Sequence, residues 1–190
     1  MSVILDVLGS IIIGAMLVLM MMTFQLQMQE AAGRLYYISS MIEHMDTAAN
    51  KLNKTIALAG IGIPADSLCV VAEASRLVFR TYWDCNSDTL SNVRHIIEIK
   101  IADSGNEYGR TLQISQDGSP LEDLGYILYI ENVVFNYFDK NDAATTSIGA
   151  ARAAEILLTF RRDSSWHPER PLRSNLQVKC FFMNSYLQGG

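Results

Sequence analysis

The residue whose position suggests chemistry is a single carboxylate at the start of a long apolar segment. Asp6 lies near the beginning of the run Val3–Phe24, and no Asp, Glu, Lys or Arg occurs between Asp6 and Glu30. A carboxylate inside an apolar span is costly in lipid unless it meets a partner or stays at the interface. If Met1 is removed, the free amine of Ser2 lies four residues before Asp6 on the same helix face. Two interpretations remain open: an assembly site, or an interfacial residue that reaches the headgroups.

The apolar run itself has the length of a membrane span. The eighteen residues from Val7 to Phe24 rise about 27 Å as a helix, close to the thickness of a hydrocarbon core. Ser10 and Gly14 form a pair of small residues four apart, which allows close helix approach in lipid, although such pairs are common by chance. A secretory signal peptide would need a basic start, a shorter core and a small-residue cleavage site. The sequence has none of these features, so we predict a retained anchor.

Catalytic signatures are sparse. No GxSxG, Walker loop or HExxH motif occurs in the sequence, and the closely spaced Gly60 and Gly62 are typical of the end of a helix. No histidine pairs with a cysteine or an aspartate at a ligand-like spacing, so we expect structural or surface roles for all three. These are His44, His95 and His167. We therefore predict a protein that is not an enzyme and that carries no cofactor.

A metal site is also not expected. Asp139, Asn141 and Asp142 could ligate calcium, but this segment lacks the glycine and glutamate of an EF-hand loop, and a solvated turn is the better interpretation. Three cysteines are too widely spaced for a zinc knuckle or a redox pair, and an odd number leaves at least one thiol unpaired. We expect at least two of them to be buried free thiols in strands. They are Cys69, Cys85 and Cys180.

Composition narrows the class of partner. The chain has 190 residues, a net charge of −5, 49% hydrophobic residues and only 18% charged residues. A low charged fraction favours a membrane or assembly context over a fully soluble one. Its Lys and Arg residues are scattered, without the basic block of a nucleic-acid footprint. We therefore predict a lipid bilayer as one partner and no nucleic acid.

The apolar pattern continues beyond the span. Apolar or small residues recur at alternating spacings of four and three, and charged residues fall off this seam. We predict one helix from about Val3 to Leu58, with residues 1–24 in the membrane and 25–63 as its amphipathic continuation. A coiled coil and a helix laid across a sheet both fit, and the small Ala31 and Ala49 favour the sheet. The larger seam residues are Leu35, Ile38, Ile42, Met45, Leu52 and Ile56.

After Pro64 the pattern becomes extended. Short apolar runs separated by turn-forming residues predict strands and an antiparallel sheet over residues 64–190. We expect a loop at 103–109, a turn at 116–120 and an exposed proline-bearing loop at 164–174. The expected fold class is α+β, a long N-terminal helix packed on an antiparallel sheet. The expected strands are 67–72, 76–83, 93–101, 111–115, 126–139, 153–162 and 175–187.

The order of these parts resembles the type IV pilin superfamily, most closely its minor pilins and the minor pseudopilins of type II secretion. Ser2–Val7 is similar to the family's mature start, with Asp6 at the fifth position where the family carries glutamate. Leu52–Pro64 resembles its leucine-rich end-of-helix segment, and Ile127–Asp142 resembles its strand of Glu-Asn-Val followed by alternating Phe and Tyr. The last two predicted strands also resemble those of the family.

This resemblance implies a structural subunit. It would be stored in a bacterial inner membrane with its C-terminal domain outside the cytoplasm, and would assemble through its N-terminal helix into a pilus, a pseudopilus or a tip complex. The implied partners are other pilin-like subunits and inner-membrane assembly machinery. In the family, the acid corresponding to Asp6 is thought to neutralise the N-terminal amine of a neighbouring subunit. The alternative is a static bitopic membrane protein whose outer domain binds a partner.

Overall fold

The computed structural model describes residues 2–64, 67–106, 109–124, 129–162 and 171–184. The chain forms two compact units, residues 1–40 and 41–190. The first unit is the N-terminal part of helix α1, which runs from Ser2 to Ala57. The predicted helix is therefore confirmed to within one residue at each end. It ends where the backbone of Gly60 and Gly62 takes φ values of 76° and 71°, which glycine tolerates far better than other residues.

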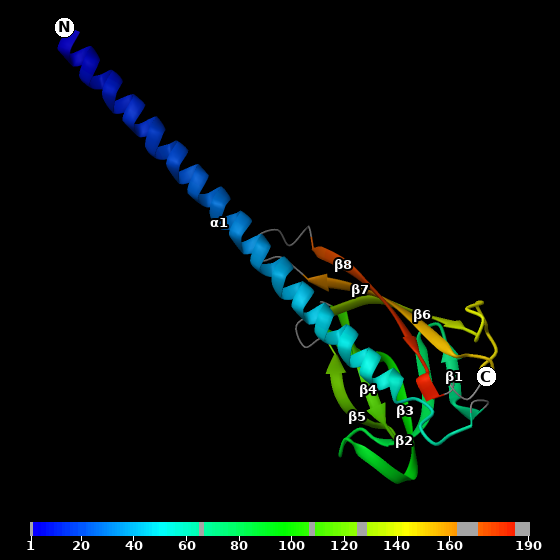
Figure 1. The fold of residues 1–190 in the computed structure, drawn as a ribbon. Helices are drawn as coiled ribbons and strands as arrows, with labels where there is room; N and C mark the ends of the chain where they lie inside the picture. Colours follow the sequence, from blue (N-terminus) through cyan, green and yellow to red (C-terminus); the bar gives the residue numbers. More distant parts are fainter. Residues whose placement is uncertain (1, 65–66, 107–108, 125–128, 163–170, 185–190) are drawn as a thin grey trace. The chain divides into compact units, whose positions relative to one another are not determined.

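The second unit holds a mixed-length antiparallel sheet (Figure 1). The order of hydrogen-bonded strands across the sheet is β1-β2-β3-β4-β6-β7-β8. Strand β5 is outside this order and pairs with β4. Every pairing between these strands is antiparallel, so the predicted α+β class is confirmed. The strands are β1 Cys69–Glu73, β2 Arg76–Asp84, β3 Thr89–Asn106, β4 Gly109–Gln116, β5 Ser119–Leu124, β6 Tyr129–Phe138, β7 Ala153–Arg162 and β8 Leu172–Phe181.

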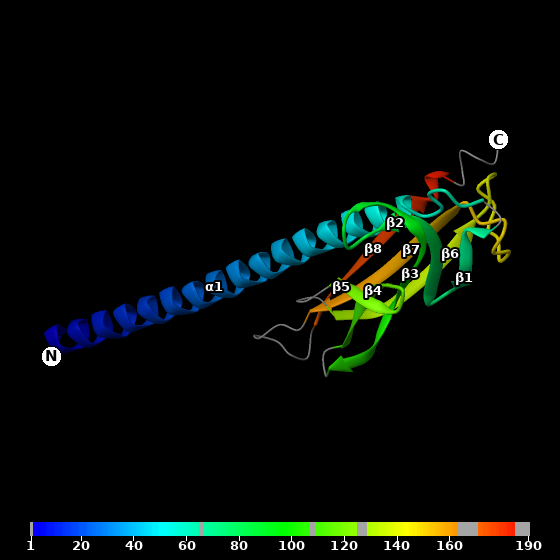
Figure 2. The same cartoon turned by 90° about the horizontal axis from the view of Figure 1, so that it is seen from below.

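The core lies between one face of this sheet and the last turns of α1. Figure 2 shows these last turns lying against the sheet. Alternate residues point inward on the central strands, as in Leu77 and Phe79 of β2 and in Ile156 and Leu158 of β7, all at most 1% exposed. This alternation follows from the two-residue period of a strand. The helix supplies Met41, Ala48, Leu52, Ile56 and the following Ala59 to the same cluster.

The sheet curls so that β6 meets the β1–β2 hairpin. Phe135 donates a backbone hydrogen bond of 2.8 Å to the carbonyl of Ala74 in the hairpin turn. The hydroxyl of Tyr137 donates to the carbonyl oxygens of Glu73 and Arg76 at 2.9 and 3.2 Å. Burial raises the pKa of Tyr137, so this hydroxyl keeps its proton. Strands far apart in the sheet order are thus tied together.

Several strand boundaries differ from the sequence-based expectation. The hairpin of β1 and β2 is confirmed, with Glu73 opposite Arg76, and β7 has the predicted bounds. The expected loop at 103–109 was wrong, because β3 continues to Asn106 and pairs it with Gly109. Backbone pairing between two hairpin arms outweighs the turn-forming character of the individual side chains there.

Strand β5 was missed. The predicted turn contains Asp117 and Gly118 with φ values of 52° and 82°, and Gln116 pairs with Ser119 across it. Two central residues with positive φ make a tight hairpin connection, so a turn of this kind implies a second strand. Strand β8 starts at Leu172, inside the predicted loop, and ends at Phe181, before the predicted residue 187. Residues 164–170 of that loop lie outside the described residues.

Candidate functional site

The candidate assembly region is the apolar segment of α1. Every apolar side chain larger than alanine from Val3 to Phe24 is more than half exposed, the least exposed being Ile12 at 52%. Exposure on all sides of the helix is typical of a membrane span or of a helix buried in an assembly. Among the described residues, α1 is the helix that is long and apolar enough to cross a membrane, judged by length and composition.

The polar side chains inside this segment satisfy their own hydrogen bonds. The hydroxyl of Ser10 donates to the carbonyl of Val7 at 2.8 Å. The hydroxyl of Thr23 lies 2.9 Å from the carbonyl of Met20 and 3.0 Å from that of Leu19. In lipid an unsatisfied hydroxyl would be costly, and bonding to the preceding turn removes that cost. The helix surface is therefore compatible with hydrocarbon from Val7 to Phe24.

The predicted assembly residues lie along the first turns of this segment. Asp6 is exposed and has no hydrogen-bond or ion-pair partner within the described part of the chain. A Cβ atom built on Gly14 would meet no atom of the described residues within 4 Å, so no other described part of the chain packs against this position. Helix α1 begins at Ser2, but the side chain of Ser2 lies outside the described residues. Among the described residues, the structure brings no second assembly residue to Asp6 as a hydrogen-bond or ion-pair partner.

The predicted seam divides between the two units and between two environments. Leu35 and Ile38 in the first unit are 67% and 39% exposed, and Ile42 at the start of the second is 60% exposed. Met45 packs against the core of the second unit, where Leu52 and Ile56 are fully buried. The exposed seam residues therefore stay available for contacts, whereas Leu52 and Ile56 hold the helix on its own sheet.

One histidine has a partner that the sequence did not indicate. His95 Nδ1 lies 2.7 Å from Asp117 Oδ2, a residue 22 positions away, because β3 and β4 place them side by side. Asp117 also accepts from the backbone amide of Ile96. The sequence shows no ligand-like spacing between His95 and Asp117, and their contact is consistent with the structural or surface role expected for His95. His44 is half-buried on α1, and His167 lies outside the described residues.

The same cluster fixes the β2–β3 turn. Gln116 is only 5% exposed; its amide nitrogen donates to Asp84 Oδ1 at 2.8 Å, and its oxygen accepts from the backbone amide of Cys85 at 2.9 Å. The side chains of Gln116 and Ser87 and the amide of Asn86 lower the pKa of Asp84 to about 2. This cluster contains hydrogen-bonding groups that build a turn, and it offers no activated nucleophile.

The acidic turn after β6 uses its carboxylates internally. Asp139 Oδ1 accepts backbone hydrogen bonds from Asn141 and Ala143 at 2.8 and 2.9 Å. Asp142 forms an ion pair with Lys179 of β8, whose ammonium also lies 4.4 Å from the ring centroid of Phe138. In the described part of the chain, no three His, Cys, Asp or Glu side chains form a cluster that could hold a metal ion. The predicted solvated turn fits this geometry.

The cysteines are free thiols. Cys69 in β1 and Cys180 in β8 are buried, as predicted for two of the three, and Cys85 is partly buried in the β2–β3 turn. Burial raises the pKa of Cys69 to about 12 and that of Cys180 to about 11. Thiolate is the reactive form of cysteine, so these two residues are unreactive at neutral pH.

The outer face of β6, β7 and β8 is polar. Glu155 on β7 accepts from Asn136 on β6 at 3.1 Å and from Gln177 on β8 at 2.7 Å, and these bonds lower its pKa. Arg173 on β8 donates two hydrogen bonds, of 2.6 and 2.9 Å, to Glu131 on β6. Cross-strand pairs of this kind suit a solvated face.

The fold is similar to that of a solved structure. A type IV-like pilin from Thermus thermophilus, TTHA1219, superposes with a TM-score of 0.53 at 9% sequence identity, covering 76% of this chain and 97% of that one. The fold is pilin-like. No protein-family model and no curated protein matches this sequence. At 9% identity, this structural similarity shows the fold and does not show the roles of individual residues. The long apolar helix at the start of this fold is compatible with a membrane anchor by its length and composition.

Proposed function

We propose that this chain is a structural subunit, a minor pilin or pseudopilin, that is stored in the membrane and assembles through α1 into a pilus, a pseudopilus or a tip complex. The observation that supports it most is the apolar helix of the pilin-like fold, exposed on every side from Val3 to Phe24 with its hydroxyls satisfied internally. Such a surface is equally suited to lipid and to the apolar sides of neighbouring helices.

The apolar side chains beyond the span favour assembly over a static anchor. From Phe24 to Ile38 the helix rises about 21 Å, which carries Ile38 well past the edge of a hydrocarbon core that ends near Phe24. Leu35 and Tyr36 are nevertheless 67% and 71% exposed. Large exposed apolar patches usually mark interaction sites. In a filament, neighbouring subunits would cover these residues, whereas a static bitopic protein would leave them in water.

Asp6 is the proposed registration residue of the assembly. In lipid, an unpaired carboxylate near the start of the span is energetically costly, and contact with a cation would stabilise it. The amine of a neighbouring subunit, or the processed amine at Ser2, would supply that charge. Gly14 and Ser10 on the same segment would let a neighbouring helix approach closely. Asp6 would then set the axial position of one helix against the next.

The proposed partners and location follow from this role. The subunit would sit in a bacterial inner membrane with residues 41–190 outside the cytoplasm, and would associate with other pilin-like subunits and with inner-membrane assembly machinery. The energy for moving α1 out of lipid would come from that machinery. The proposal assigns no catalytic step, cofactor or nucleic-acid contact to the chain.

Fractionation after mechanical shearing tests this proposal. Cells producing the full chain are sheared, and the chain is followed in the medium and in the membrane fraction, with detergent resistance as a second criterion. We expect a detergent-resistant polymer in the sheared fraction. A chain that remains wholly in the membrane and dissolves as a monomer in mild detergent would support the static bitopic protein instead.

A further inference from the structure

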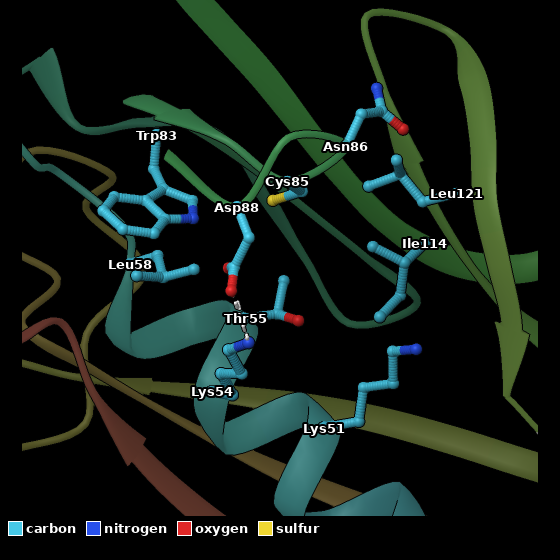
Figure 3. Close-up of a pocket in the computed structure, with 10 residues that line it drawn as sticks. All are labelled: Lys51, Lys54, Thr55, Leu58, Trp83, Cys85, Asn86, Asp88, Ile114 and Leu121. Carbon is cyan, nitrogen blue, oxygen red and sulfur yellow. Dashed lines mark hydrogen bonds and ion pairs between the residues drawn. The ribbon is translucent and has the colours of Figure 1, made fainter. Parts of the chain in front are cut away.

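A pocket of about 310 Å³ lies within the second unit, between the last turns of α1 and the β2–β3 turn (Figure 3). Its size is at the lower end of the range for small-molecule sites. Figure 3 shows side chains from α1, from the β2–β3 turn and from β4 and β5 around the same space. The pocket involves none of the residues proposed for filament assembly, so its role is independent of the proposed function.

One side of the pocket is cationic. Lys51 and Lys54 are three residues apart on α1, and neighbours at this spacing share a helix face. Asp88 is the acidic residue among those that line the pocket. It lies 3.4 Å from the Lys54 ammonium, but both side chains are more than 60% exposed. An ion pair in such contact with water is weak and exchanges readily, so a second carboxylate can compete with Asp88 for Lys54.

Apolar side chains line the pocket on two sides: Figure 3 shows Leu58 and Trp83 on one side of Asp88, and Ile114 and Leu121 on the other. Ile114 of β4 is buried, Leu121 of β5 and Leu58 are partly buried, and all three line the space. Trp83 contributes its indole ring, and its Nε1 is buried without a hydrogen-bond partner among the described residues. In Figure 3 the nitrogen lies on the edge of the indole that faces Asp88.

The wall that closes the pocket is held in place before any ligand arrives. Asp84 accepts from the amide of Asn86 at 3.0 Å and from the hydroxyl of Ser87 at 2.7 Å. Gln116 then holds both Asp84 and the amide of Cys85. Because the turn is already ordered by these bonds, a ligand would not bear the entropy cost of ordering it.

We propose that this pocket binds a carboxylate carried on a compact apolar group, with the carboxylate at Lys51 and Lys54 and the apolar group against Ile114, Leu121 and Trp83. The carboxylate takes over part of the contact between Lys54 and Asp88 and accepts charge-assisted hydrogen bonds from the two ammonium groups. The apolar group fills the space beside the sheet. A small organic acid and the C-terminal residue of a peptide share this chemistry.

Titration of the full chain in detergent micelles tests the assignment. The probe is 4-phenylbutyrate, and the readout is the indole ¹H–¹⁵N signal of Trp83, assigned with the variant Trp166→Phe. Its neutral amide, 4-phenylbutyramide, controls for partition into the micelle. A second pair of probes, acetyl-Gly-Gly-Phe with a free or an amidated C-terminus, distinguishes the peptide source from the small acid by which acid binds more tightly.

The variants identify the pocket as the place of binding. We expect saturable shifts with the acids, and about tenfold weaker binding in Lys51→Met and in Lys54→Met, the loss expected when one charge-assisted contact disappears. Asp88→Asn should tighten binding about threefold by removing the competing carboxylate. Lys140→Met, at an exposed position of the turn after β6, should leave binding unchanged.

Three results would overturn the assignment. The first is the absence of a saturable shift with either acid. The second is equal binding of the acids and their amides, which would make the carboxylate irrelevant. The third is binding that survives both lysine substitutions while the spectrum of the rest of the domain remains that of the parent chain. If its spectrum shows that a lysine variant is unfolded, that variant is replaced by Lys51→Gln or Lys54→Gln. The same criteria then apply.

Discussion

The hydroxyl of Thr81 donates a hydrogen bond of 2.7 Å to the carbonyl of Leu58, one residue beyond the end of α1. The same oxygen accepts from the backbone amide of Trp83 at 3.0 Å. Thr81 is fully buried, at the position where the pairing of β2 with β3 shifts register. One side chain therefore satisfies a terminal carbonyl of the helix and an amide released by the bulge.

Replacing Thr81 by valine should destabilise the sheet unit. The change keeps the shape of the side chain but leaves the carbonyl of Leu58 and the amide of Trp83 without their partner, at a cost of about 2 kcal/mol. Thermal or chemical unfolding of the full chain in micelles, followed by tryptophan fluorescence, measures the change. Thr146→Val, at an exposed position, is the matched control and should be nearly neutral. Equal stability of both variants would refute this role for Thr81.

The helix end also depends on Gly60. A Cβ atom at Gly60 would lie 2.8 Å from Leu68 Cδ1, and Leu68 is only 1% exposed. Gly118 has a similar φ of 82°, but a Cβ there would meet nothing within 4 Å. Gly118→Ala should therefore lower the free energy of unfolding by about 1 kcal/mol, because of the backbone conformation alone. Gly60→Ala should lower it by about twice as much, because the clash with Leu68 is added. Equal losses in the two unfolding measurements would show that the packing against Leu68 has no effect.

The turn beside the pocket should respond to acid. The pKa of Asp84 in the folded chain is about 2, below its ordinary value of 3.8. A lowered pKa means that the carboxylate stabilises the folded state above pH 3.8 and that this contribution disappears as the pH falls towards 2. Asp84→Asn should therefore flatten the melting-temperature profile in this interval. Asp46→Asn, at an exposed position of α1, should keep the parent profile. A parent slope retained in Asp84→Asn would contradict the assignment.

Much of the fold follows from local sequence patterns, and the exceptions have physical reasons. The long helix, the β1–β2 hairpin and β7 could be predicted because their apolar residues keep one period throughout. The end of β3 and all of β5 could not, since they consist of turn-forming residues whose strand conformation comes from backbone pairing with β4. Pairing between strands is a tertiary property that a local pattern does not contain.

The site was predictable to a lesser degree. The apolar segment and Asp6 are visible in the sequence because membrane spans have a simple composition. The seam was placed by its seven-residue spacing, yet the structure buries Met41 and Ala48 and exposes Ile42, because the face directed to the sheet follows the 3.6-residue turn of the helix. The meeting of His95 with Asp117, 22 residues apart, required the register of β3 and β4. The pocket likewise required the tertiary structure.

Asp6 is expected to matter for assembly and not for the stability of the sheet unit. Asp6→Ala should abolish or strongly reduce the sheared polymer, while Asp6→Glu should retain it, because a second carboxylate supplies the same charge. The unfolding midpoint of the sheet unit should stay at the parent value in both variants. N-terminal mass analysis of the same material shows which amine is free. Normal polymer in Asp6→Ala would exclude the registration role.

The exposed seam residues offer a second test of assembly. Ile38→Ser and Ile42→Ser remove apolar surface that is 39% and 60% exposed in the single chain. Burial of such surface between subunits contributes roughly 1 to 2 kcal/mol per side chain, so the polymer should become less abundant or dissociate at lower detergent concentration. Leu90→Ser, which removes a 67% exposed apolar side chain from β3, is the control. A polymer with unaltered detergent resistance would show that the seam is not an interface.

The most direct measurement is site-specific photo-crosslinking from Leu17, which lies in the middle of the span and is 57% exposed. A photoreactive amino acid at this position traps whatever surrounds the helix in intact cells. The same amino acid at Lys140, in the exposed turn of the sheet unit, reports non-specific collisions. A filament subunit predicts ladders of chain-to-chain or chain-to-pilin adducts from Leu17 in the sheared fraction. Adducts to lipid alone, with no protein adduct in any fraction, would contradict the proposed function.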